Sequence, residues 1–211
     1  MINSIQSTIL KGSWVQLEPL NESHKNELYS AAQDESIWAY NSTKAYGEDF
    51  YRWFNKAMEC FQSHQHFPFV VRRLSDAKII GSTRYYDINP EHHRLSIGYT
   101  WYVPEAWGGS VNPECKFLLL KFAFENLQVN RVEFAIDSRN TRSRAAVKKI
   151  GATEEGVLRH HLILEDGFIR DTVVFSIIKP DWSQIKLALK SRLEKDPTGC
   201  TVLPLEGDFI S

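Results

Sequence analysis

The order of three strand-like segments, one helix and a fourth strand constrains the fold of this chain more than any other feature. Residues 67–74, 77–88 and 93–103 are strand-like, and short polar connections separate them, as in an antiparallel meander. Residues 114–127 then give a nearly continuous apolar helix, and 131–137 alternates apolar with polar side chains. A helix between two strands indicates a crossover connection. The pattern therefore predicts an α/β (α+β) domain with a mixed sheet.

Further elements precede this central unit. Residues 12–20 predict a first strand that Pro19 closes. Two helical patterns follow, a weaker one at 22–33 behind Asn21 and a stronger one at 50–61 with a single apolar stripe.

The C-terminal elements carry clear start and stop signals. Asn140 is placed as the N-cap of a short helix, and Gly151 follows its end. Two strands then meet at Asp166-Gly167, a dipeptide that favours a tight hairpin turn, and residues 182–193 form an amphipathic helix. In total the chain predicts about seven strands, mostly antiparallel, with flanking helices.

The 211 residues suffice for one domain with a substantial core. We predict a single domain over residues 1–194 and a tail over 195–211, because the tail has Pro and Gly residues and no periodic pattern. The 25 Lys and Arg residues nearly balance the 26 Asp and Glu residues. No overall charge therefore attracts the chain to nucleic acid or to an anionic membrane.

Targeting, redox and metal signals are weak in this sequence. No apolar run is long enough for a membrane span, and the N-terminus has neither a basic start nor an apolar core, so we expect a cytoplasmic protein. Cys60, Cys115 and Cys200 lack close spacing, which predicts free thiols. Two histidine pairs, at 64 and 66 and at 92 and 93, have no third ligand spaced with them, so we expect no metal.

The loop before the apolar helix is the first candidate binding site. It contains Gly108, Gly109 and Ser110, and Asn112 is placed to cap a helix whose first residue is Pro113. A helix start presents N–H groups without intrahelical partners and the positive end of the helix dipole, so an anion such as a diphosphate is a natural ligand. The same residues also suit a loop that only turns the chain, and they match neither a P-loop nor a dinucleotide-binding fingerprint.

Three longer stretches of the chain carry a family resemblance: "IGYTWYVPEAWGGSVNPECKFLLLKFAFE", "NRVEFAIDSRNTRSRAAVKKIGATEEGVLR" and "DGFIRDTVVFSI". They resemble the GNAT acetyltransferase superfamily, and within it the Rim-type group, which is similar to ribosomal-protein N-terminal acetyltransferases. The likeness covers roughly residues 10–180. It implies the acyl-CoA N-acyltransferase fold, with acetyl-CoA as co-substrate.

The resemblance also implies a set of cofactor-binding residues. In the family, the backbone amides of an Arg/Gln-x-x-Gly-x-Gly/Ala loop hold the pyrophosphate of acetyl-CoA. The matching residues are Trp107, Gly108, Gly109, Ser110, Val111 and Asn112. Ser110 and Asn112 replace two signature residues, but the amides remain.

The start of the helix predicted after residue 140 supplies two further candidate cofactor-binding residues. Asn140 either contacts the pantetheine arm or only caps its helix. Arg142, with neighbouring basic residues, either meets the 3′-phosphate of CoA or lies on a solvated helix face; the neighbours are Arg139, Arg144, Lys148 and Lys149.

For catalysis, the resemblance implies direct attack of an amine on the thioester in a ternary complex. Ser143 matches a hydroxyl that some Rim-type enzymes place near the thioester sulfur, where it protonates the leaving thiolate; the alternative is local capping. Many relatives have a Glu that acts as the general base at the position where this chain has Ser96. The remaining base candidates are His160 or His161, of which at most one faces the cleft, and Glu155. A surface or core histidine is the alternative reading.

The sequence thus predicts an N-acetyltransferase acting on a primary amine, with a protein N-terminal α-amine as one class of acceptor. A small-molecule acceptor is the first alternative, whether a polyamine, an amino acid or an antibiotic. A non-catalytic acyl-CoA-binding module is the second. The sequence does not distinguish a monomer from a homodimer.

Overall fold

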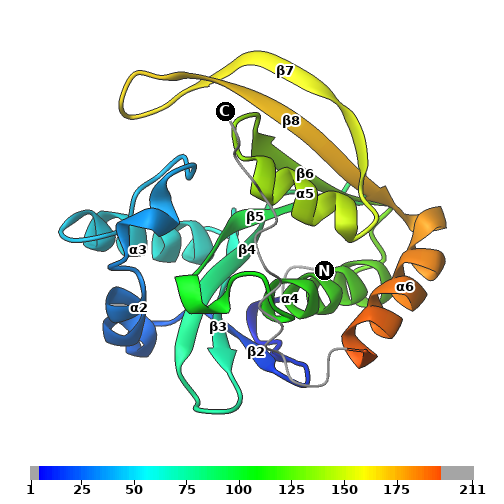
Figure 1. The fold of residues 1–211 in the computed structure, drawn as a ribbon, viewed down its shortest axis with the longest axis horizontal. Helices are drawn as coiled ribbons and strands as arrows, with labels where there is room; N and C mark the ends of the chain where they lie inside the picture. The colour runs from blue at the N-terminus through cyan, green and yellow to red at the C-terminus, as the bar shows by residue number, and fades with distance from the viewer. Residues whose placement is uncertain (1–4, 196–211) are drawn as a thin grey trace, which may run out of the picture.

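The computed structural model describes residues 5–195, which build one eight-stranded sheet with helices on both faces (Figure 1). The strands are β1 (Leu10–Lys11), β2 (Val15–Pro19), β3 (Phe67–Arg73), β4 (Ile79–Asn89), β5 (Arg94–Tyr102), β6 (Arg131–Asp137), β7 (Thr153–Ile163) and β8 (Ile169–Ile178). Their order in the sheet is β1-β2-β3-β4-β5-β6-β8-β7. Only β5 and β6 pair in parallel. The predicted mixed, mostly antiparallel sheet is confirmed, with one strand more than expected because β1 precedes the segment 12–20. The tail predicted at 195–211 lies almost wholly outside the described residues.

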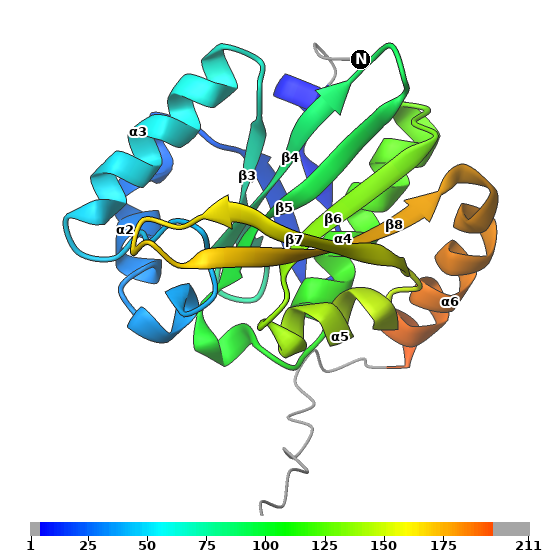
Figure 2. The same cartoon turned by 90° about the horizontal axis from the view of Figure 1, so that it is seen from above.

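Helices cover the two faces unequally, as Figure 2 shows from above. The helices are α2 (Lys25–Ala31), α3 (Asp49–Gln62), α4 (Val111–Lys121), α5 (Thr141–Lys149) and α6 (Trp182–Glu194). Side chains of α2 and α3 pack with Val70 and Trp101 in a smaller core, whereas α4, α5 and α6 pack with Phe69 and Phe175 in a larger one. Successive strand residues point to opposite faces, so Phe69 and Val70 belong to different cores. Within residues 5–195, no helix has the length and apolar character needed to cross a bilayer.

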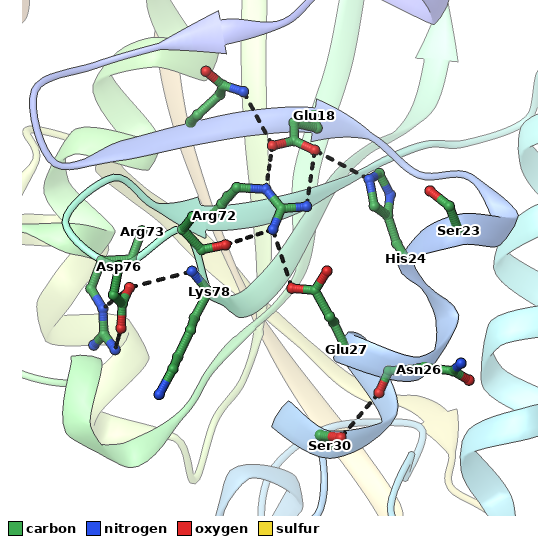
Figure 3. Close-up of polar contacts among 12 residues, drawn as sticks. Glu18, Ser23, His24, Asn26, Glu27, Ser30, Arg72, Arg73, Asp76 and Lys78 are labelled. Atoms are coloured by element: carbon green, nitrogen blue, oxygen red, sulfur yellow. Dashed lines mark hydrogen bonds and ion pairs between the residues drawn. The ribbon is translucent and has the colours of Figure 1, made fainter.

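A partly buried ionic network joins α2 to strands β2 and β3 (Figure 3). The Nε atom of Arg72 on β3 donates to Glu18 Oε1 on β2 at 2.6 Å, and its Nη1 donates to Glu27 Oε2 on α2 at 3.2 Å. His24 Nε2 lies 3.1 Å from the other oxygen of Glu18. One guanidinium thus joins β2 and β3 to α2, the helix that follows β2.

The crossover helix starts earlier than the sequence pattern predicted. We expected a helix over 114–127, but α4 begins at Val111, and a π-helical turn, Phe122–Asn126, continues it. Ser110 therefore takes the N-cap position. The prediction that Asn112 caps the helix with Pro113 as its first residue is wrong. Asn112 lies in the first turn, where its Oδ1 accepts a hydrogen bond from the hydroxyl of Tyr102 at 3.2 Å.

The parallel pairing of β5 and β6 is short, and this creates an opening in the sheet. The two strands pair only from Arg94 opposite Arg131 to Ser96 opposite Glu133. Both continue past this point, β5 as far as Tyr102 and β6 as far as Asp137. Tyr99 has a positive φ of 50°, and the β4–β5 register shifts there, so a β-bulge bends β5. The β5 edge after Ser96 is therefore not paired with β6, and we call this region the strand opening.

Candidate active site

The predicted cofactor loop, residues 107–112, lies between the short turn after β5 and the first turn of α4, at the mouth of the strand opening. Gly108 has a φ of +81°, a left-handed conformation that L side chains rarely adopt, and no atom lies within 4 Å of the position that a Cβ would occupy. A ligand can therefore approach the backbone closely at Gly108. The first amides of α4 follow directly, and first-turn amides have no intrahelical acceptor.

Glu114, the acidic residue in the first turn of α4, is held by other donors. It is 3% exposed, and its carboxylate accepts hydrogen bonds from the backbone amides of Ser13, Trp14 and Val15 at 2.7, 2.8 and 2.9 Å. The negative charge is thus turned away from the loop and into the β1–β2 turn. The helix start keeps its preference for an external anion.

The second predicted segment, at the start of α5, lies at the same edge of the sheet, because the parallel strands β5 and β6 both end there. The side chain of Asn140 accepts a hydrogen bond from the Ser143 amide at 2.9 Å, so Asn140 is the N-cap that the sequence predicted. The guanidinium of Arg142 stacks on the ring of Trp107, 3.8 Å from its centroid. This contact joins the cofactor loop to the start of α5 across the strand opening.

Ser143 is not the residue that caps the helix. Its backbone amide is used by Asn140, and within residues 5–195 its hydroxyl has no hydrogen-bond partner. Local capping, the alternative role of Ser143, is therefore filled by a neighbour.

Most of the predicted basic cluster is neutralised within the fold. Arg139 Nη2 binds Asp137 Oδ2 at 2.7 Å, and Lys148 Nζ binds Glu154 Oε2 at 2.8 Å. Arg144 is 3.8 Å from the same Glu154 oxygen. Arg142 and Lys149 have no carboxylate partner among the described residues.

His160 and His161 lie on β7 in a wide bulge. Leu158 pairs with Thr172 and Leu162 with Arg170, so three residues of β7 oppose only Asp171 on β8. His160 has a φ of 50°, and its backbone amide donates to Asp171 Oδ1 at 2.7 Å. Both histidines are exposed, and residues 157–161 line an open hollow beside the strand.

Glu155 is bound by two neighbours that weaken it as a base. Its carboxylate accepts from Arg131 Nη1 at 2.6 Å and from the Ser176 hydroxyl at 2.7 Å. The hydrogen bonds from Arg131 hold the pKa of Glu155 at about 2, despite partial burial that acts in the opposite direction. A carboxylate with so low a pKa accepts a proton poorly, so this geometry argues against Glu155 as the general base.

Glu133 is a base candidate that the sequence reasoning missed. Its parallel register with Ser96 places the two side chains on the same face of the sheet, at the last pair before the strand opening. The carboxylate is partly exposed and lies 2.7 Å from Arg131 Nη2. A carboxylate therefore stands beside the position where relatives carry their base, but on the neighbouring strand. Its place on the polar side of segment 131–137 was the only signal in the sequence.

Aromatic side chains of β4 and β5 divide between the two faces of the sheet. Tyr85 is fully buried toward α4, where its hydroxyl donates to the Leu119 carbonyl at 2.6 Å. Tyr86, Tyr99 and Trp101 lie on the opposite face, which carries α3. We call this side of β4 and β5 the acceptor face. The β7–β8 hairpin reaches toward α3 in both views, and Glu165 at its tip binds Arg52 of α3 at 3.3 Å (Figures 1 and 2).

The described cysteines are buried thiols, and the described residues contain no group of metal ligands. Cys60 and Cys115 are buried free thiols, and burial raises the pKa of Cys115 to about 12. Cys200 lies outside the described residues. In the described part of the chain, no three His, Cys, Asp or Glu side chains group as metal ligands.

Comparison with known proteins identifies the family. Residues 15–153 match the family described as "Acetyltransferase (GNAT) domain". A protein of Bacillus subtilis (strain 168) named "Putative ribosomal N-acetyltransferase YdaF" is 33% identical over 110 residues, which cover 52% of this chain and 58% of that protein. The chain thus spans little more than half the length of this relative. "Probable N-acetyltransferase YjcK" from the same strain is 23% identical over 184 residues, or 83% of this chain and all of that protein.

Solved structures agree on the fold. A GCN5-related N-acetyltransferase from Brucella melitensis is 27% identical, with a TM-score of 0.84 over 92% of this chain and 90% of that one. Mycobacterium smegmatis RimJ, solved in complex with CoA-disulfide, is 18% identical, with a TM-score of 0.72 over 87% of this chain and 91% of that one. The family match covers about two thirds of the sequence, and in the structure a glycine loop and a capped helix flank the strand opening. This chain therefore belongs to the GNAT family of N-acetyltransferases.

Proposed function

We propose that the protein transfers an acetyl group from acetyl-CoA to a primary amine by direct attack within a ternary complex. The observation that carries the proposal is the Arg142–Trp107 contact, which brings the cofactor loop and the start of α5 together at the mouth of the strand opening. A glycine loop before one helix start, joined by this contact to the start of a second helix, suits a ligand that carries both a diphosphate and a reactive group.

The residues present fit acetyl-CoA. Amides of residues 108–112 can hold the diphosphate, since Gly108 leaves room for close approach. The β5 edge beyond Ser96 offers backbone donors and acceptors for the amides of a pantetheine arm. Among residues 5–195, Arg142 and Lys149 have no carboxylate partner, so they are the cations of this cluster available to the 3′-phosphate. Asn140 supports this arrangement by fixing the start of α5.

The thioester supplies the acetyl group, and side chains of the protein accept the proton of the amine and donate one to the leaving thiolate. The amine attacks only when neutral. An N-terminal α-amine, with a pKa of about 8, needs only a weak base to lose its proton, whereas a lysine, with a pKa of about 10.4, needs a stronger one. Glu133 and His160 are the candidates to accept that proton. We assign to Ser143 the protonation of the leaving thiolate, because its hydroxyl lies in the first turn of α5 and has no hydrogen-bond partner in the described part of the chain.

Two measurements test the proposed function. Isothermal titration with acetyl-CoA should show one site per chain, and no binding at millimolar ligand would overturn the proposal. Release of free thiol should then be followed across peptides with different N-terminal residues and across small amines. Turnover with at least one amine above background hydrolysis is expected. Binding without any turnover would favour the acyl-CoA-binding module instead.

Gly108→Ala should weaken acetyl-CoA binding about five- to tenfold. The added methyl group strains a left-handed backbone by about 1 kcal/mol and projects into the space that the diphosphate would use. The measurement is the Kd from isothermal titration. Gly167→Ala is a matched control, because Gly167 has the same φ of +81° and equally open surroundings, but lies in the β7–β8 turn. Equal Kd values for both variants would remove the loop from the cofactor site.

A further inference from the structure

Arg84 is a buried cation in the middle of the acceptor face. It lies on β4 opposite Gly98 of β5, two residues beyond the last β5–β6 pair, and is only 3% exposed. Its guanidinium lies 4.3 Å from the ring centroid of Tyr99 and 5.7 Å from that of Trp53 on α3. Arg84 is therefore placed where the strand opening meets the face beneath α3.

Within residues 5–195, Arg84 has no anionic partner. Its single hydrogen bond runs from Nη1 to Nδ1 of His66 at 3.2 Å, and the buried Nε atom has no partner at all. Burial and the nearby Arg84 charge lower the pKa of His66 to about 4, so this imidazole is neutral at pH 7 and accepts the bond. The Nε–Nη2 edge, the side on which a guanidinium binds a carboxylate through two parallel hydrogen bonds, is unused.

The aromatic rings compensate this charge only in part. Cation–π contacts contribute about 0.5–2 kcal/mol, whereas removing an ion from water costs several kcal/mol. Burial lowers the pKa of Arg84 to about 10, which still leaves it charged at pH 7. An uncompensated charge held in a rigid aromatic setting is well suited to an anion that arrives from outside.

A second observation points to the same face. Five buried side-chain polar atoms in the described residues have no hydrogen-bond partner: Arg84 Nε, Trp101 Nε1, Arg144 Nε, Arg170 Nε and Thr172 Oγ1. Strand register places four of them, all except that of Arg144, on the face that carries Arg84. Native proteins pair the large majority of such atoms. Their concentration around the strand opening indicates a polar ligand that bonds to several of them.

We propose that the amine acceptor carries a carboxylate, which binds the Nε–Nη2 edge of Arg84 while the amine faces the strand opening. This inference rests on the proposed function and specifies its acceptor. It excludes polyamines, whose charge Arg84 repels, and selects amines with an acid group. The carboxylate belongs either to a free amino acid or to an acidic residue at the N-terminus of a protein.

Matched acceptor pairs test the proposal and separate these two sources. One arm compares free amino acids with their carboxamides, and the other compares peptides that begin with Asp or Glu with peptides that begin with Asn or Gln. In one arm, we expect kcat/KM by thiol release to favour the carboxylate by about 10- to 100-fold, the range of a charge-assisted pair. Equal values within every pair would overturn the proposal, even if turnover itself supports the acetyltransferase reading.

Arg84→Met should abolish that preference. The variant should lower kcat/KM for the carboxylate members only, while the Kd of acetyl-CoA and the melting temperature stay near those of the wild type. Arg84→Lys keeps a charge without the two-pronged edge, so it should restore part of the preference and guards against a folding failure of Arg84→Met. Arg52→Met, at an exposed arginine of α3, is the matched control. Equal losses for carboxylates and carboxamides would mean a structural role and would overturn the proposal.

An equilibrium measurement stands apart from activity. In the CoA-saturated protein, the Nε–H resonance of Arg84 should shift on titration with N-acetylglycine and stay fixed with N-acetylglycinamide. The Arg84→Met spectrum assigns the signal by its disappearance. An unmoved resonance up to 100 mM of the acid would refute carboxylate binding at Arg84, whatever the enzyme acetylates.

Discussion

Replacing Glu114 with alanine should lower the free energy of unfolding by about 3–5 kcal/mol, because each buried donor left unsatisfied costs about 1–3 kcal/mol. The carboxylate accepts three backbone hydrogen bonds from residues 13–15 and is 3% exposed. Its loss leaves three amides without an acceptor inside the fold. Urea denaturation followed by circular dichroism measures the change.

Two further variants sharpen this expectation. Glu105→Ala removes an acidic side chain that is 65% exposed, and its effect should stay within about 0.5 kcal/mol. Gly12→Ala should be nearly as damaging as Glu114→Ala, because a Cβ at Gly12 would lie 2.3 Å from Glu114 Cδ. A cost below about 1 kcal/mol for Glu114→Ala would show that water replaces the carboxylate, and that the β1–β2 turn does not depend on it.

Ser143→Ala should reduce kcat by about 100-fold while the Kd of acetyl-CoA changes less than twofold. General acid catalysis contributes about 10²–10⁴-fold, and an interaction made only in the transition state lowers kcat without weakening ground-state binding. The helix cap should survive, because it uses the backbone amide of residue 143. Steady-state thiol release and isothermal titration give the two values.

Thr141→Ala is the matched control for Ser143→Ala. Thr141 is a hydroxyl residue in the same first turn of α5 but is exposed. Its loss should leave kcat unchanged, and the two variants should have similar melting temperatures. An unaltered kcat for Ser143→Ala would remove Ser143 from the mechanism. A raised Kd with normal kcat would make it a cofactor-binding residue instead.

Local chemistry made several elements predictable. The period-2 pattern over 131–137 gave the bounds of β6, because alternation reports directly on a half-buried strand. Asn140 was recognised as an N-cap, since capping needs only a side-chain oxygen a few residues from its donor. The predicted start of α4 was wrong because a contact from outside the segment decides it. Asn112 and Pro113 resemble an N-cap and a first helical residue, but Tyr102, from another element, binds the Asn112 side chain.

The candidate site was predictable only in its backbone-based parts. Glycines and caps are visible in sequence, so the glycine loop and the N-cap Asn140 could be recognised, whereas their role in cofactor binding stays a prediction. The general base was not, because its choice depends on partners that are distant in the chain. Glu155 was weighed as a base, but Arg131 binds it through two hydrogen bonds that hold its pKa low. Glu133 shares the same Arg131 through one contact and reaches the strand opening through a three-residue parallel pairing that no local pattern encodes.

By itself, the sequence determined the meander, the crossover helix, the caps and the glycine loop, since each depends on the conformational preferences of neighbouring residues. Only the tertiary structure decided where charges lose their partners. Arg84 reads as an ordinary polar residue of a strand, and Glu114 as an acidic residue favourable to a helix start. Burial makes the first an unpaired cation and the second an acceptor for residues about 100 positions away. The physical reason is that propensity is local, whereas desolvation and charge pairing depend on the whole fold.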